Sequence, residues 1–200
     1  MRVLVACEFS GIVREAFAKR GHDAWSCDLL PTEIPGQHIQ GDVLPLLNQN
    51  WDLMIAHPPC TYLSNAGACR LYPQKGTLNI ERYKKGIEAK EFFIQLYNSP
   101  IEKICIENPV SSKVFNMPKH SQEIQPHQFG HPYSKKTRLW LKNLPILKPT
   151  EIINIYTPFL PAGTSRKDKS KYGAKDCAHE SKSRSKTFQG IANAMAEQWG

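Results

Sequence analysis

The stretch Trp51-Asp-Leu-Met-Ile-Ala-His-Pro-Pro-Cys60 is an apolar strand that runs into two prolines and ends on a cysteine. Proline cannot donate to a sheet ladder and restricts the residue before it, so Pro58 and Pro59 end the strand and stiffen the turn that carries Cys60. In open α/β sheets, ligands bind just outside the carboxyl ends of the strands. The stretch therefore predicts a doubly wound sheet with a thiol at the edge where such a fold keeps its active site.

The length, cysteine content and charge of the chain indicate which class of protein it belongs to. The chain has 200 residues, enough for one domain with a sizeable core. It lacks an apolar run long enough to span a membrane and begins without a signal peptide, so we expect a cytoplasmic protein with reduced, scattered cysteines. A net charge of +8 indicates an anionic partner, of which nucleic acid is the commonest.

Hydrophobic periodicity extends the pattern along the chain and predicts a single α/β domain over residues 1–200, with a mostly parallel, doubly wound sheet. Residues 61–77 lack periodicity and are expected to form a functional loop over the site. The Ser/Lys/Arg-rich stretch at about 160–186 is expected to be a mobile basic loop, because it has too little apolar surface to bury. We expect strands at 2–6, 24–27, 52–56, 101–106, 137–141 and 152–156, and helices at 11–20, 79–97 and 192–199.

Polar residues follow the first two strands in an order that suits an adenosine-containing cofactor. Phe9-Ser10-Gly11 opens a helix whose N-terminus can receive a polar ligand. Asp28, at the end of the second strand, can accept hydrogen bonds from ribose hydroxyls. Asp42 could then accept from an exocyclic adenine amine. Each aspartate could equally cap a turn, and the prediction depends on their order.

The next two strand ends supply a thiol, Cys60, and a carboxyl group, Glu107. A nucleophilic cysteine beside an acid that can protonate a ring nitrogen is what conjugate addition to a pyrimidine requires. Addition of the thiolate to carbon 6 makes carbon 5 electron-rich enough to attack a methyl group. The pair therefore indicates methyl transfer to a pyrimidine.

Seven segments, in order, resemble the motifs of DNA cytosine-5 methyltransferases. Pro58-Pro59-Cys60 is similar to the catalytic Pro-Cys motif, and Glu107-Asn108-Pro109 to the Glu-Asn-Val motif. Phe9-Ser10-Gly11 is similar to the cofactor turn, Asp28 to the ribose-binding acid and Gly41-Asp42-Val43 to the adenine clamp. Ser134-Lys-Lys-Thr-Arg138 is similar to the arginine strand, and Gly190-Ile-Ala-Asn-Ala194 to the final Gly-Asn-Ala segment. The likeness is greatest to short members from phages and prophages.

The resemblance implies a Rossmann-like class I methyltransferase fold that uses S-adenosylmethionine on a flipped cytosine of double-stranded DNA, in a bacterial or phage-infected cell. The catalytic residues that it implies are Cys60, Glu107, Arg138 and Lys136, and no metal is implied. The cofactor residues that it implies are Phe9, Ser10, Gly11, Asp28, Asp42, Pro58 and Asn193.

The chain departs from the family at two places. Val13 and Arg14 stand where the cofactor turn continues with glycines. Only about 45 residues replace the large target-recognition domain, so the basic stretch offers mostly phosphate contacts.

Other readings remain open. An enzyme that methylates an exocyclic nitrogen would carry Asp, Asn or Ser where His57 stands and an aromatic residue in place of Cys60, so these two residues argue against that alternative. Zinc could bind His127, His131, Cys177 and His179, although their spacing is not that of a standard finger. A catalytically silent nucleic-acid-binding homologue, or an enzyme acting on RNA or free pyrimidine nucleotides, would also fit.

Overall fold

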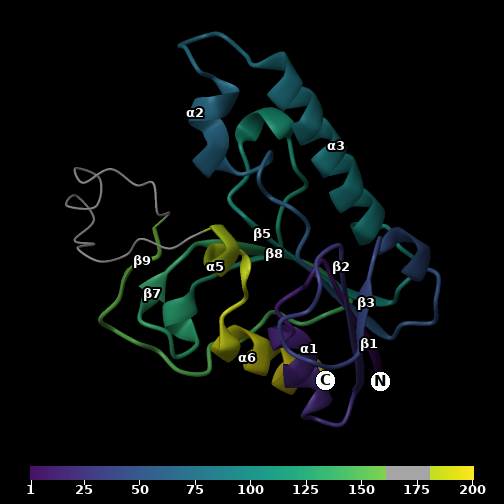
Figure 1. Ribbon diagram of the computed structural model, residues 1–200. Coiled ribbons are helices and arrows are strands. Elements are labelled where there is room, and N and C mark those ends of the chain that lie inside the picture. The colour runs from purple at the N-terminus through teal and green to yellow at the C-terminus, as the bar shows by residue number, and fades with distance from the viewer. Residues whose placement is uncertain (161–180) are drawn as a thin grey trace.

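Seven strands form one mixed sheet in the computed structural model, which describes residues 1–160 and 181–200 (Figure 1). These strands are β1 (Arg2–Ala6), β2 (Asp23–Asp28), β3 (His38–Gln40), β4 (Leu53–Ala56), β5 (Lys103–Pro109), β6 (Gln122–Ile124) and β8 (Thr137–Lys142). A separate pair is formed by β7 (Tyr133–Ser134) and β9 (Thr157–Pro158). The helices are α1 (Ile12–Ala18), α2 (Ala68–Leu71), α3 (Ile80–Tyr97), α5 (Ser181–Ser185) and α6 (Gln189–Trp199), with 3-10 turns η1 (Leu44–Leu46), η2 (Asn65–Gly67), η3 (Lys113–Phe115) and η4 (Pro126–Gln128).

The order of the strands in the sheet is β3-β2-β1-β4-β5-β8-β6. The strands from β3 to β5 pair in parallel, whereas β8 runs antiparallel to both β5 and β6. The first five strands follow the 3-2-1-4-5 order of Rossmann-like, doubly wound sheets. This topology confirms the predicted mostly parallel α/β fold and places the switch point, where ligands bind in such sheets, between β1 and β4.

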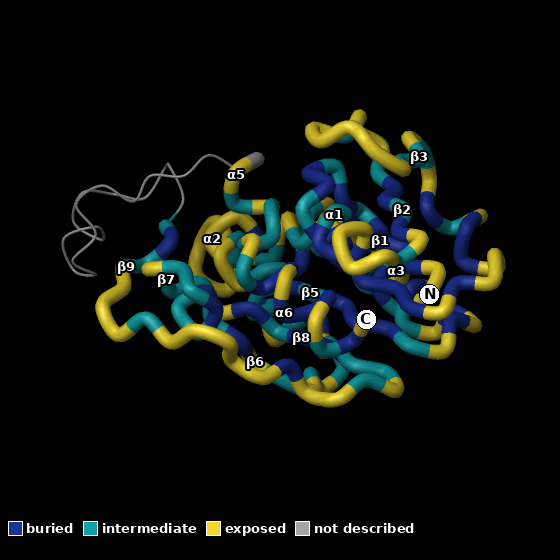
Figure 2. Tube along the Cα trace, turned by 90° about the horizontal axis from the view of Figure 1, so that it is seen from below, coloured by how far each residue is buried: buried dark blue, intermediate teal, exposed yellow. Residues whose placement is uncertain are grey.

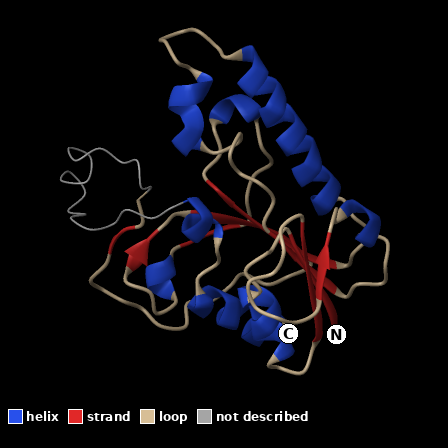
Figure 3. Ribbon diagram, in the orientation of Figure 1, coloured by secondary structure: helices blue, strands red, loops and turns tan. Residues whose placement is uncertain are grey.

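Helices cover both faces of the sheet because the central strands are apolar on both sides (Figure 3). On one face, Val3, Val5 and Ile55 pack with the apolar sides of α1 and α6. On the other face, Leu4 and Met54 lie in a cluster with residues from the C-terminal half of α3. The tube in Figure 2 shows the buried course of β5 through the middle of the molecule.

The helix α2, the first half of α3 and the turn η3 project beyond the sheet (Figure 1). They enclose a small apolar cluster of their own, built on Leu63, Leu71 and Phe115. Gly86 of α3 faces Phe115, since a Cβ at this glycine would lie 2.2 Å from the ring. The segment predicted as an irregular loop, 61–77, therefore contains η2 and α2, and it is anchored through its buried leucines.

Most predicted elements are confirmed, and the differences have physical causes. The strand expected at 152–156 is absent, and Ile152 and Ile155 are 65% and 87% exposed there. The strands β3 and β6 were not predicted because three residues are too few to show an alternation. The predicted basic loop at about 160–186 falls mostly outside the described residues. No helix within the described ranges is long and apolar enough to cross a membrane.

Candidate active site

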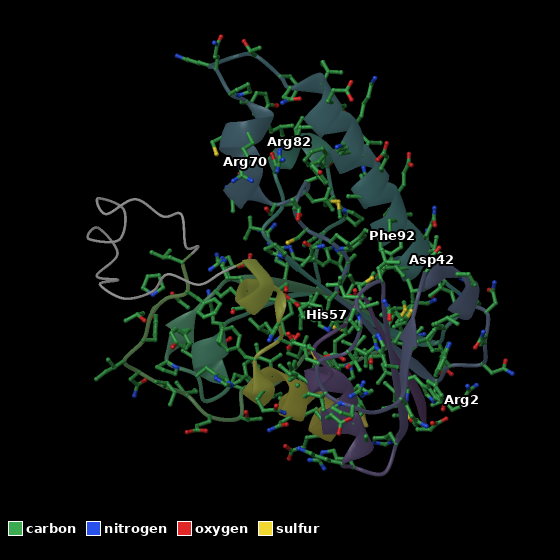
Figure 4. All side chains as sticks on the ribbon, in the orientation of Figure 1. Arg2, Asp42, His57, Arg70, Arg82 and Phe92 are labelled. Atoms are coloured by element: carbon green, nitrogen blue, oxygen red, sulfur yellow. The ribbon has the colours of Figure 1, made fainter. Side chains whose placement is uncertain are left out.

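The ends of β4 and β5 bring a histidine and a glutamate together at the carboxyl edge of the sheet. Ala56 pairs with Ile106 across the two parallel strands, so the next residues, His57 and Glu107, lie opposite one another. The Nδ1 atom of His57 is 2.8 Å from Oε2 of Glu107, and the two side chains are only 8% and 15% exposed. Figure 4 shows His57 near the middle of the molecule, away from Arg70 and Arg82 of the projecting part.

Burial of Glu107 favours its neutral form, but a hydrogen bond and a nearby charge outweigh that effect. The hydrogen bond from His57 and the charge of Lys135 together lower the pKa of Glu107 below its ordinary value. The carboxyl group is therefore ionised at neutral pH in the free protein.

Cys60 sits on the tight turn that follows the two prolines. Its carbonyl oxygen accepts hydrogen bonds from the backbone N–H groups of Leu63, at 3.1 Å, and Ser64, at 2.8 Å, which fix the turn. Burial and the nearby Glu107 charge raise the pKa of the thiol, while Lys135 and Arg184 oppose the rise. The structure thus brings Cys60 and Glu107 together and surrounds them with two cations.

Two small pockets open beside this group. The first, called here the Glu107 pocket, is lined by Glu107, Lys135 and Thr137 and closed by Phe188. The second, called here the Ser10 pocket, is lined by Cys7, Glu8, Phe9, Ser10 and His57. Lys186 and Thr187, between α5 and α6, line both pockets. Lys186 also reaches across to Glu33, with its Nζ 2.5 Å from Oε2.

Glu8 caps the helix that opens beside the Ser10 pocket. Its buried carboxylate accepts hydrogen bonds from the backbone N–H groups of Val13, at 2.7 Å, and Arg14, at 3.2 Å, and from Oγ of Ser10, at 3.1 Å. The first turn of α1, expected to receive a ligand, therefore already holds an internal anion. Gly11 precedes this turn with φ of 75°, a conformation that favours glycine.

Asp28 and Asp42 lie close to Cys7 at the same edge of the sheet. Burial, Asp28, Cys27 and Asp42 raise the pKa of the Cys7 thiol to about 12. Each aspartate also stabilises its own turn, since Asp28 accepts from the N–H of Leu30 at 2.9 Å and Asp42 from that of Leu44 at 3.0 Å. With Glu8, they make this edge acidic.

Arg14, which with Val13 stands where the resembled cofactor turn has glycines, stabilises the local fold. It is almost fully buried, and its guanidinium donates to Oγ of Ser26, Oγ1 of Thr32 and the carbonyl oxygen of Ile34. It thereby ties the segment after β2 to α1. Because that segment also contacts the carbonyl oxygen of Phe9 through a backbone hydrogen bond of 2.8 Å, it lies beside the cofactor turn predicted from the sequence.

The two cations predicted to hold the substrate lie elsewhere. Arg138 and Lys136 both pair with Glu123, at 3.3 and 3.0 Å. Side chains alternate along a strand, so Arg138 points to the face opposite Thr137, which lines the Glu107 pocket. Lys135 lies beside Glu107 instead. The motif comparison had assigned this role to Lys136, the next residue along the chain.

Of the seven predicted cofactor residues, Phe9 and Ser10 line the Ser10 pocket, and the other five line neither pocket, namely Gly11, Asp28, Asp42, Pro58 and Asn193. Pro58 is buried within the turn, and Asn193 is exposed on α6, where its Oδ1 accepts from Nε2 of Gln189 at 2.9 Å. The sequence comparison also missed His57, Lys135 and Arg184. Of these, His57 could have been found from the pairing of the ends of β4 and β5. Arg184 could not, because it is far from Cys60 in sequence and no local pattern reveals that the two are close.

The candidate zinc ligands do not gather within residues 1–160 and 181–200, where no group of three or more His, Cys, Asp or Glu side chains could hold a metal. The ring of His127 stacks on Tyr156 at 4.0 Å, and Nε2 of His131 accepts from the N–H of Gly190 at 2.9 Å. Cys177 and His179 lie outside the described residues.

Comparisons with known proteins give distant structural likeness only. No protein-family model matches the chain, and no curated protein matches its sequence. A prophage protein of E. coli described as a DNA modification methyltransferase is similar with a TM-score of 0.45 and 16% identity, over 77% of this chain and 52% of that one. A variant of Spodoptera frugiperda DNMT2 gives a TM-score of 0.39 and 16% identity, over 80% and 55%. This chain therefore spans about half the length of each.

Proposed function

We propose that this protein transfers a methyl group from S-adenosylmethionine to carbon 5 of cytosine in DNA. The observation that carries the proposal is that Glu107 and Lys135 line one pocket where β4 and β5 end and β8 begins, close enough to Cys60 for their charges to shift the pKa of its thiol. A nucleophile, an acid for a ring nitrogen and a cation are the groups that conjugate addition to a pyrimidine needs.

The Ser10 pocket and the acidic edge beside it suit a cofactor that carries positive charge. Glu8 already occupies the first N–H groups of α1, so a phosphate would meet a carboxylate there. S-adenosylmethionine has no phosphate and bears an ammonium and a sulfonium group, and when bound it supplies an electrophilic methyl group. Phe9, Ser10 and Gly11 would hold it, with Asp28 and Asp42 on the ribose and adenine.

The chain's own residues then account for each step at the base. Cys60 loses its thiol proton to solvent and the thiolate bonds to carbon 6, while Glu107, after taking up a proton, passes it to ring nitrogen 3, so that carbon 5 becomes nucleophilic. After methylation, carbon 5 loses its proton to solvent, Cys60 leaves carbon 6, and nitrogen 3 returns its proton. Lys135 and Arg184 favour the thiolate at the first and last steps.

DNA is the proposed substrate because the pocket rim is cationic. Lys135 and Lys186 line the Glu107 pocket, the charge of Arg184 acts on the nearby Cys60, and the chain carries a net charge of +8. Cytosine would be flipped into the Glu107 pocket, since its two faces are covered inside the base stack. Recognition through phosphates predicts weak sequence preference and a steep loss of affinity with salt.

The test is transfer of labelled methyl groups from S-adenosylmethionine to DNA, to RNA of the same sequence and to free cytidine nucleotides. We expect 5-methylcytosine in DNA, and at least a hundredfold less transfer with Cys60→Ser or Glu107→Gln. Transfer to RNA or nucleotides alone would refute the substrate assignment. Product with a methyl group on the exocyclic nitrogen would refute the chemistry.

A catalytically silent nucleic-acid-binding protein is the second candidate. It is favoured by the raised pKa of Cys60, which keeps the thiol protonated in the free protein. Calorimetric titration with S-adenosylmethionine separates the two, because a silent homologue would bind DNA without binding the cofactor at millimolar concentration.

A further inference from the structure

His57 links the two pockets. It lines the Ser10 pocket, and its Nδ1 atom is 2.8 Å from Oε2 of Glu107, which lines the Glu107 pocket. Its Nε2 atom is buried without a hydrogen-bond partner in the described part of the chain. A buried polar atom without a partner is costly, so its retention calls for a role.

The proposed chemistry, on which this inference rests, gives such a role. Ring nitrogen 3 must receive a proton as Cys60 adds, yet Glu107 is ionised in the free protein and has none to give. Lys135 lies beside Glu107, but its Nζ donates to the carbonyl oxygen of Arg184 at 2.7 Å. The group in hydrogen-bond contact with the carboxylate is the imidazole of His57.

We propose that His57 is a positioning residue of the reaction, which holds Glu107 toward the Glu107 pocket and supplies the proton that this carboxyl group passes to the base. The imidazolium form gives its Nδ1 proton to Glu107, and the carboxyl group gives a proton to nitrogen 3. Both transfers reverse when Cys60 leaves carbon 6. The pair therefore gains and loses no proton over one turnover.

Other ionisable groups face the pair and contribute to any pH dependence. They are Cys60, Cys105, Lys135 and Lys186 around Glu107, with Cys7 and Glu8 in the pocket that His57 lines. The experiment therefore compares variants at His57 over one pH range, so that these groups are common to all profiles.

His57→Asn is the decisive variant, because its amide can donate to Glu107 but cannot carry a transferable proton. We expect its kcat for methyl transfer to DNA to fall about a hundredfold at neutral pH, with KM for DNA unchanged. The pH profile of kcat should differ between wild type and the variant, because only wild type has a side chain at position 57 that can transfer a proton. A kcat within threefold of wild type with an unchanged pH profile would overturn the inference.

A measurement on the free protein separates this inference from the proposed function. In ¹⁵N-labelled protein, we expect the Nδ1 atom of His57 to carry a proton bonded to the carboxylate, and this signal to be lost in Glu107→Ala. An unprotonated Nδ1 would overturn the inference even in an active enzyme. If wild type transfers no methyl group to any pyrimidine, the proposed function fails and the inference with it, whatever the ring carries.

Discussion

Replacement of Glu8 by glutamine should destabilise the protein although it changes only one atom. The carboxylate of Glu8 is 4% exposed and satisfies two backbone N–H groups, those of Val13 and Arg14, and the hydroxyl of Ser10. Glutamine keeps one accepting oxygen but turns an NH₂ group toward the remaining N–H. One buried donor then loses its acceptor, and the negative charge at the start of α1 disappears.

The magnitude follows from those two losses. An unsatisfied buried donor costs about 1–3 kcal/mol, and a charge at a helix N-terminus contributes about 0.3–2 kcal/mol. We therefore expect the free energy of unfolding to fall by roughly 2–4 kcal/mol, which corresponds to about 5–15 °C in Tm for a chain of this size.

The assay is equilibrium unfolding in urea, with Glu197→Gln as the matched control. Glu197 is exposed and pairs with Arg20 only at 3.6 Å, so the same change there should alter stability by no more than about 0.5 kcal/mol. If the two variants unfold at the same urea concentration, Glu8 does not cap α1.

Three further predictions concern the site and its supports. Alkylation of Cys60 by iodoacetamide should be slow at neutral pH and accelerate as pH rises, since the pKa of the thiol is raised. Lys135→Gln should slow the alkylation further, because it removes a charge that lowers this pKa. An unchanged rate in the variant would contradict the effect of Lys135 on Cys60. Gly86→Ala should lower the free energy of unfolding by about 1–3 kcal/mol despite the higher helix propensity of alanine, because the new Cβ would meet Phe115; a urea midpoint above that of wild type would oppose this packing. Lys135→Gln should reduce methyl transfer at least tenfold and Arg138→Gln much less, and the reverse order would restore the assignment made from the sequence.

The sheet could be predicted where hydrophobic patterns were long. The strands β1, β4 and β5 each contain an uninterrupted apolar run, at 3–6, 53–56 and 104–106, and α3 begins at Ile80, directly after its N-cap Asn79. The apolar run at 152–156 misled because its side chains face solvent, which no local pattern distinguishes from a core strand. Ile80 itself is exposed because α3 extends beyond the sheet.

The grouping of Cys60 with Glu107 followed from the order of strand ends, since adjacent parallel strands end at one edge. The positions of the lysine and arginine side chains near Glu107 could not be predicted in the same way. A shift of one residue at the start of β8 exchanges Lys135 for Lys136, and strand alternation then turns Arg138 to the other face. The contact of Lys186 with Glu33 joins residues too distant in sequence for any pattern to reveal.

Covalent trapping tests the central claim, that Cys60 attacks the base, most directly. The protein is incubated with S-adenosylmethionine and DNA containing 5-fluorocytosine, whose fluorine cannot leave as the proton does, so the adduct accumulates. We predict a stable protein–DNA adduct with wild type and with Cys69→Ser, a control at an exposed free cysteine, and none with Cys60→Ser. An adduct that survives Cys60→Ser, or none with wild type that binds both ligands, would contradict the account.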